Sequence, residues 1–116
     1  MQQWPEISDD PLYQFLHNED IDGFNQHRDS LDQSQLRGKS YRSLDLRSMK
    51  AHGLDFRDAY FRNADLRGID FRTAQLEGAS MASANISGCY FPAELDAAEI
   101  RMSIEFGTRL RYSTSS

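Results

Sequence analysis

The chain has 116 residues, of which 27% are charged and 39% hydrophobic, and its formal net charge is −5. Length and composition predict one domain over residues 1–116 and exclude a disordered or fibrous chain. Apolar runs never exceed three residues, so the sequence predicts no membrane span and no membrane partner.

Two features of the sequence bear on its compartment. The first ten residues, MQQWPEISDD, hold neither the basic segment nor the apolar run of a secretory signal. Cys89 is the only cysteine, so an internal disulfide is excluded. Both features indicate a reducing compartment, and we expect a cytoplasmic protein.

Charge is distributed unevenly along the chain. Residues 1–35 carry eight acidic side chains and one basic side chain, a net charge of −7. Residues 36–91 carry nine basic and six acidic side chains, a net charge of +3, and residues 92–116 have a net charge of −1. The sequence therefore divides into an acidic head, a mildly basic body and a C-terminal segment.

Residues 1–35 predict an N-terminal helical cap. The segment SDDPLYQFLHN, residues 8–18, predicts a short helix with Ser8 or Asp9 as N-cap and a proline in its first turn. Apolar residues three apart predict a second short helix over residues 19–28. Two helices with one apolar face each would cover the end of the structure that follows them.

A large apolar residue returns at every fifth position from residue 36 to residue 91. The twelve positions are Leu36, Tyr41, Leu46, Ala51, Phe56, Phe61, Leu66, Phe71, Leu76, Met81, Ile86 and Phe91, and only Ala51 is small. A second apolar residue, mostly small, lies two positions before each of them from residue 44 onward. Neither the helical period of 3.6 nor the strand period of two keeps such residues on one face. A coil that turns a corner every five residues does, and stacked coils would bury both positions.

Three stretches of this body share one motif: ADLRG (64–68), AQLEG (74–78) and ANISG (84–88). They resemble the A-(D/N)-L-x-x signature of the pentapeptide-repeat family. The resemblance implies a mainly β fold, a right-handed quadrilateral β-helix of about three coils over residues 36–91. The inward positions supply the expected structural core, which consists of Leu46, Phe56, Phe61, Leu66, Phe71, Leu76, Met81, Ile86 and Phe91.

Residues 92–116 predict a C-terminal cap and a tail. Asp96 followed by Glu99 resembles a capping box, helical spacing follows, and a glycine then suits a helix stop, so a helix over 96–106 is preferred. Two slipped repeats of five over the same residues are the alternative. We expect a short strand over 108–112 and then a disordered tail, STSS.

The sequence contains no recognisable catalytic or metal-binding motif. Its histidines, His17, His27 and His52, lack metal-ligand spacing, and Cys89 falls on an inward position. A nucleophile elbow, a P-loop, a dinucleotide fingerprint and a C-x-x-C pair are all absent. We therefore expect no catalytic residue, no metal site and no cofactor, in a protein that is not an enzyme.

Arginine follows the large inward residue in most repeats, at Arg37, Arg42, Arg47, Arg57, Arg62, Arg67 and Arg72. In one interpretation, neighbouring aspartates neutralise these arginines on a solvated wall, where exposed pairs contribute about 0–1 kcal/mol each. In the other, the arginines form a surface that binds an anionic or acidic partner. The side with fewest acids indicates a contact patch of Arg42, Tyr60 and Arg62, with Arg47 and Arg67 as further candidates.

These features favour a non-enzymatic protein-interaction or scaffold module with an unidentified protein partner. The resemblance implies an alternative, because some family members are acidic, dimeric DNA mimics that modulate DNA gyrase or topoisomerase. This chain departs from that pattern because its body is short and basic. A homodimer through the C-terminal helix would lengthen the body but would not make it acidic. Weak binding of anionic or nucleic-acid ligands by the arginines is a further alternative. The acidic head opposes it, so no nucleic-acid partner is expected.

Overall fold

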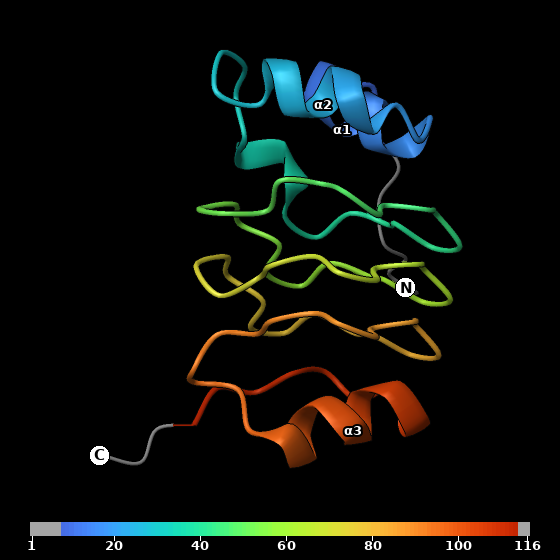
Figure 1. Cartoon of the computed structure of the whole chain (residues 1–116), viewed down its shortest axis with the longest axis vertical. Coiled ribbons are helices and arrows are strands. Elements are labelled where there is room, and N and C mark those ends of the chain that lie inside the picture. Colours follow the sequence, from blue (N-terminus) through green and yellow to red (C-terminus); the bar gives the residue numbers. More distant parts are fainter. Residues whose placement is uncertain (1–7, 114–116) are drawn as a thin grey trace, which may run out of the picture.

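The computed structural model describes residues 8–113 (Figure 1). Two ranges lie outside the described residues, 1–7 and 114–116. The expected absence of a secretory signal rests largely on the first range, and most of the expected tail lies in the second. The first helices of the chain lie at one end of a stack of coils and the last helix at the other (Figure 1). We call the stack, residues 36–91, the repeat column.

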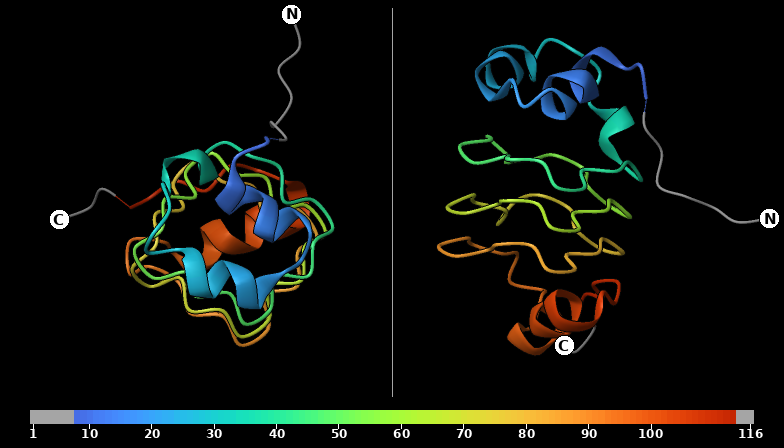
Figure 2. Two further views of the ribbon diagram at one scale, coloured as in Figure 1. Left: turned by 90° about the horizontal axis from the view of Figure 1, so that it is seen from above. Right: turned by 90° about the vertical axis from the view of Figure 1, so that its right-hand side faces the viewer.

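Helices are the regular elements of residues 8–113: α1 (Pro11–His17), α2 (Ile21–His27), the 3-10 helix η1 (Ser34–Leu36) and α3 (Ala97–Phe106). Seen along the stack, α1 and α2 lie over one end of the coils (Figure 2). No helix in the described part of the chain has the length and apolar content needed to cross a bilayer.

The expected fold class, a mainly β, right-handed quadrilateral β-helix, is wrong. Residues 8–113 contain no continuous strand and no sheet. Isolated parallel bridges between residues 20 apart join neighbouring coils instead, as between Ser40 and Tyr60 and between Asp45 and Asp65. The repeat column is therefore a stack of coils held by single bridges rather than by strand ladders.

The corners of the coils explain why no strand forms. A residue with φ between 57° and 81° occurs at almost every fifth position, namely at Gly38, Ser43, Ser48, Gly53, Asp58, Asn63, Gly68, Gly78, Ser83 and Gly88. A left-handed residue interrupts extended backbone, so the segment between two corners is too short for a ladder. The period of five is therefore a period of turns.

Backbone hydrogen bonds hold each coil on the next. The N–H of Phe61 donates to the carbonyl of Ser80 at 2.8 Å, and the N–H of Leu66 donates to the carbonyl of Asn85 at 2.9 Å. The N–H of Ser80 returns a bond to the carbonyl of Ala59 at 3.0 Å. Each coil thus satisfies backbone groups of its neighbours, as a buried backbone requires.

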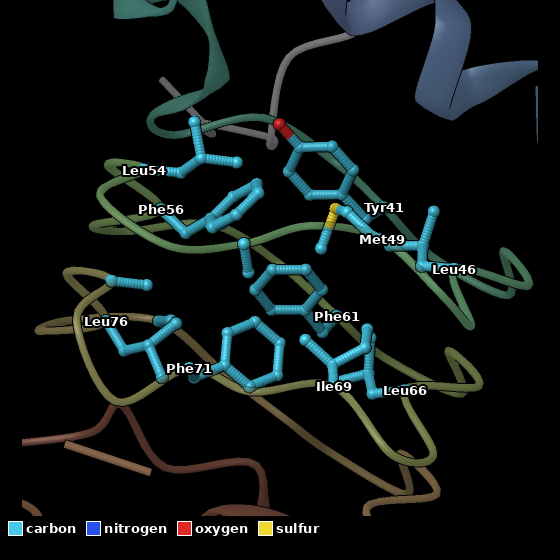
Figure 3. Close-up of a cluster of buried hydrophobic side chains, with 14 of the residues drawn as sticks. Tyr41, Leu46, Met49, Leu54, Phe56, Phe61, Leu66, Ile69, Phe71 and Leu76 are labelled. Carbon is cyan, nitrogen blue, oxygen red and sulfur yellow. The ribbon is translucent and has the colours of Figure 1, made fainter. Parts of the chain in front are cut away.

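The inward side chains form one core along the axis of the repeat column (Figure 3). Of the nine expected core residues, seven are fully buried, while Ile86 and Phe91 at the end near α3 are partly buried. Aromatic rings of neighbouring coils contact each other, with ring centroids 5.1 Å apart for Tyr41 and Phe61 and 5.9 Å apart for Phe71 and Phe91. Buried alanines hold the second inward position in half of the repeats, and larger buried residues such as Met49, Leu54 and Ile69 hold it in others.

Helices α1 and α2 each begin with an aspartate. The Asp10 carboxylate accepts a hydrogen bond from the Tyr13 N–H at 3.0 Å, and Asp20 caps α2 in the same way. The sequence predicted Ser8 or Asp9 as the N-cap of α1. This prediction is wrong, because Asp10 takes that position. The Ser8 hydroxyl instead accepts a hydrogen bond from the Asp10 N–H, which places Ser8 outside the helix.

Side chains of the N-terminal segment satisfy backbone groups at the exposed edge of the first coil. The Tyr13 hydroxyl donates to the Ser40 carbonyl, and the Glu19 carboxylate accepts from the Asp45 N–H. The Asn25 amide donates to the Ser48 carbonyl and accepts from the Lys50 N–H. The Arg28 guanidinium donates to the Lys50 and His52 carbonyls. Arg28 is buried although it is charged, because its guanidinium hydrogen-bonds these carbonyl groups. The N-terminal segment therefore protects an edge that would otherwise be open to association.

The structure decides between the two alternatives for residues 96–106 in favour of the helix, α3. The expected capping box is wrong. Asp96 makes no side-chain capping bond, and Glu99 instead accepts a hydrogen bond from the Arg111 N–H at 3.1 Å. Gly107 ends the helix in the left-handed conformation, with φ at 72°.

The segment after α3 runs back along the last coil. The N–H of Leu110 donates to the carbonyl of Ala79 at 2.8 Å. Among the described residues, the expected strand over 108–112 amounts to one antiparallel bridge between Ser80 and Arg109. The C-terminal segment thus pairs with backbone that no further coil covers.

We predict that Phe71→Ala destabilises the protein by about 3–5 kcal/mol, because the substitution leaves a cavity in the middle of the core. Phe91→Ala should cost less, because the Phe91 side chain is already partly exposed at the end of the column. Urea unfolding of the wild type and both variants measures the two losses. Equal losses, or a loss below about 1 kcal/mol for Phe71→Ala, would show that Phe71 is not part of a tightly packed core.

We predict that Arg28→Met destabilises the protein by about 1–3 kcal/mol, because two backbone carbonyls of the first coil lose their donors. Methionine keeps the apolar length of the side chain. The control is Asp29→Asn, which removes the charge of an exposed partner and should change stability by no more than about 0.5 kcal/mol. Thermal unfolding compares the two variants, and equal effects would contradict the role of Arg28 in covering the coil edge.

Candidate interaction surface

Four arginines on the wall of the repeat column pair with the aspartate two residues before them: Arg47 with Asp45, Arg57 with Asp55, Arg67 with Asp65 and Arg72 with Asp70. In each pair, Nε and Nη2 donate to the two carboxylate oxygens at 2.7–3.0 Å. The backbone N–H of the arginine donates to the same carboxylate at 3.0–3.3 Å. We call this arrangement the Asp-x-Arg unit. Its bidentate bonds occupy the Nε–Nη2 edge of the guanidinium and pair its charge with a carboxylate.

The Asp-x-Arg units hold their carboxyl groups in the ionised form. The hydrogen bond from the paired arginine side chain lowers the pKa of Asp45 and of Asp70 to about 2. The same cause lowers the pKa of Asp55 and of Asp65. Because the pairs lie on a solvated wall, water weakens their contribution to stability. Their main consequence is that each unit neutralises its own charge.

Arg37 finds its carboxylate on the next coil. Its Nη2 lies 3.4 Å from the Asp58 carboxylate, which is also 3.8 Å from Nη1 of Arg109. Asp58 therefore lies between two arginines that come from distant parts of the chain. With Arg37, five of the seven arginines on the wall have an aspartate partner.

Arg42 and Arg62 are the two exceptions. The residues two positions before them are Ser40 and Tyr60, which carry no carboxylate. Within residues 8–113 neither guanidinium has a hydrogen-bond or ion-pair partner, and both side chains are exposed. These two are therefore the wall arginines whose charge no described side chain neutralises.

The coils place these two arginines on neighbouring levels of one side. Ser40 and Tyr60 form a parallel bridge, and the N–H of Ser43 donates to the carbonyl of Arg62 at 2.8 Å. Backbones joined in this way lie roughly 4.8 Å apart. We call Ser40, Arg42, Tyr60 and Arg62 the Arg42–Arg62 face. It presents two guanidinium groups beside one partly exposed phenol ring.

The structure divides the five residues expected in the contact patch. Arg42, Tyr60 and Arg62 lie together on the Arg42–Arg62 face, whereas Arg47 and Arg67 belong to Asp-x-Arg units on the following side. The residue two positions before each arginine separates the two groups, and this signal can be read from the sequence.

A shallow hollow beside the Asp-x-Arg units was missed by sequence reasoning. It has a volume of about 550 Å³ and is lined by Glu19, Ile21, Asp45, Arg47, Ser48, Arg67 and Gly68. Glu19 belongs to the N-terminal segment, so no local pattern indicates that it lies beside the wall. The two arginines that line the hollow are already paired with aspartates, which leaves little free cationic charge in it.

The side chains of His27 and Cys89 make packing and hydrogen-bond contacts within the protein. His27 stacks on Phe15 with ring centroids 5.1 Å apart. The Cys89 thiol donates to the Leu66 carbonyl at 2.9 Å, and burial raises its pKa, which disfavours the nucleophilic thiolate. The described part of the chain has no group of three or more His, Cys, Asp or Glu side chains that could hold a metal ion.

Comparison with known proteins finds a family model that matches part of the chain. The family model for pentapeptide repeats matches residues 55–91, with eight copies. This match confirms the resemblance seen in the motifs, and it covers Tyr60 and Arg62 but not Arg42. No curated protein and no solved structure matches the chain.

We predict that the protein loses stability as the pH falls from about 4 to about 2. The folded-state pKa of Asp45 and of Asp70 is about 2, below the value of about 3.9 in an unfolded chain. Their stabilisation is therefore complete above pH 4 and is lost as the carboxyl groups become protonated. Carbon-detected NMR titration should give midpoints near 2 for both carboxyl groups. Midpoints near 4 would show that the Asp-x-Arg units do not persist in solution.

Proposed function

Residues 55–91 are pentapeptide repeats, and we propose that the protein is a non-enzymatic interaction module whose Arg42–Arg62 face binds an acidic region of a protein partner. The observation that carries this proposal is the contrast between the arginines. Five of the seven on the wall have an aspartate partner, while Arg42 and Arg62 lie together without one among residues 8–113.

The composition of the Arg42–Arg62 face supports this proposal. Arginine and tyrosine are the residue types that carry much of the binding energy in protein interfaces. Two cations with no acidic partner attract an acidic surface and raise the rate of encounter. The phenol ring adds apolar area at a low cost in conformational entropy.

The rigidity of the repeat column also supports binding. The backbone that carries the face is held by hydrogen bonds to neighbouring coils, such as the bond of the Tyr41 N–H to the Tyr60 carbonyl at 2.7 Å. A rigid backbone loses little further freedom when a partner binds, so less of the contact energy is spent on ordering.

The alternatives drawn from the sequence gain no support from the wall. Phosphate binding over many contacts needs many free cations, whereas most of these arginines are paired. A DNA mimic needs free carboxylates, whereas the wall aspartates of the Asp-x-Arg units are paired with arginine. A homodimer through α3, where Met102 and Phe106 are exposed, and a cytoplasmic location both stay predictions.

Affinity capture with matched variants tests the proposed function. We expect immobilised wild-type protein to retain a partner from nuclease-treated lysate of its host, and Arg42→Ala/Arg62→Ala to lose it. The control is Arg47→Ala/Arg67→Ala, which lowers the net charge equally, has the same spacing and should keep the partner. Quantitative mass spectrometry measures retention at low and at physiological ionic strength, because salt screens exposed charges.

Thermal unfolding first establishes that both double variants are folded. A set of retained proteins that is the same for all three forms would contradict the proposed function. A loss that is equal in both double variants would contradict it too, because binding would then depend on overall charge and not on the Arg42–Arg62 face.

A further inference from the structure

We propose that the Arg42–Arg62 face recognises a phosphorylated side chain of its protein partner. This inference rests on the proposed function and names the group that the two free arginines bind. It follows from the number, the spacing and the unpaired state of the guanidinium groups.

The two guanidinium groups can converge on one ligand. The bond from the Ser43 N–H to the Arg62 carbonyl places the backbones of Arg42 and Arg62 on adjacent coils, roughly 4.8 Å apart. Each arginine directly precedes a corner of its coil, at Ser43 or Asn63, and both are exposed. Two acidic residues of an extended partner segment that share a face lie roughly 6.6 Å apart, which matches this spacing less well than one compact anion does.

The charge of the face matches a phosphate better than a carboxylate. A phosphorylated side chain carries about −1.5 to −2 charges at neutral pH and three strong acceptor oxygens. Two arginines can each offer it a bidentate pair of N–H donors. A single carboxylate has one charge and two oxygens, so it would leave one of the two cations without a partner.

The next side of the same wall shows what the face would look like if it were already occupied. Arg47 and Arg67 have the same spacing of 20 residues, and the Leu46 N–H donates to the Asp65 carbonyl at 3.0 Å. There, Asp45 and Asp65 fill the positions that a bound anion would take, at 2.7 Å from the arginine Nη2 atoms. Ser40 and Tyr60 replace these aspartates on the Arg42–Arg62 face and leave the donors available.

Tyr60 gives the face a contact beyond the anion. Its backbone bridges both Ser40 and Ser80, so the residue lies at the centre of the side that carries Arg42 and Arg62. The ring is partly exposed and can pack against the peptide that carries the phosphate. This contact favours a modified protein side chain over free phosphate.

A peptide titration followed by NMR tests the inference directly. The probe is a short capped peptide, Gly-Ala-phosphoserine-Ala-Gly, compared with the same peptide carrying serine or glutamate and with inorganic phosphate. We expect shifts of the arginine Nε–H signals of Arg42 and Arg62 and not of Arg47 and Arg67. The Arg42→Gln/Arg62→Gln variant should bind the phosphopeptide at least about tenfold more weakly, and Arg47→Gln/Arg67→Gln should bind it like the wild type.

Each outcome of the titration is decisive. Shifts spread over all wall arginines, or equal affinity for the serine or glutamate peptide, would overturn the inference. Binding of inorganic phosphate as tight as that of the phosphopeptide would also overturn it, because the face would then hold a free anion and not a modified side chain.

Phosphatase treatment separates this inference from the proposed function. Capture from lysate that depends on Arg42 and Arg62 and disappears after phosphatase treatment supports both. Capture that depends on these arginines but survives phosphatase overturns the phosphate inference and leaves the proposed function intact. Capture that does not depend on them contradicts the proposed function itself.

Discussion

Each coil of the repeat column depends on the next one for two things at once: partners for its backbone hydrogen bonds and cover for its inward side chain. The Phe61 N–H finds its acceptor 19 residues further on, at Ser80, while the Phe61 ring packs between those of Tyr41 and Phe71. The hydrogen bond to Ser80 and the ring contact with Tyr41 both join neighbouring coils, so a single coil would lack them. The regular wall, with its outward side chains at fixed spacing, is a consequence of this stacking.

Because of the same dependence, the first and last coils each have one side without a neighbouring coil to pair their backbone groups. The chain covers these two ends in different ways. At the first coil, side chains make the hydrogen bonds that backbone groups of a neighbouring coil make elsewhere. The buried Arg28 guanidinium, which donates to the Lys50 carbonyl, is an example. At the last coil, Leu110 offers its own backbone to Ala79, and the Ser103 hydroxyl accepts a bond from the Met81 N–H at 2.9 Å. Both solutions satisfy groups that would otherwise invite association with another chain.

The wall turns this architecture into a pattern of charge. Wherever aspartate precedes arginine by two residues on the wall, the coil geometry brings the two side chains into one ion pair. The carboxylate then neutralises the guanidinium charge. Where serine or tyrosine takes the place of aspartate, as before Arg42 and Arg62, the cation stays available. For most wall arginines, neutralisation thus depends on the residue two positions earlier, and the chain presents both versions on neighbouring sides.

The sequence by itself determined the period, the inward positions and the basic wall, because these follow from side chains that recur every five residues. It also determined which arginines have an aspartate two positions earlier, and hence the distinction between Arg47 and Arg42. It did not reveal the fold class, because a left-handed residue at nearly every corner prevents strands, and residues such as Ser43 and Asp58 adopt this conformation although it is uncommon outside glycine. Only the tertiary structure placed Glu19, Asn25 and Arg28 on the edge of the first coil and Glu99 beside Arg111. These contacts join residues 12 to 26 positions apart, and no local periodicity records them.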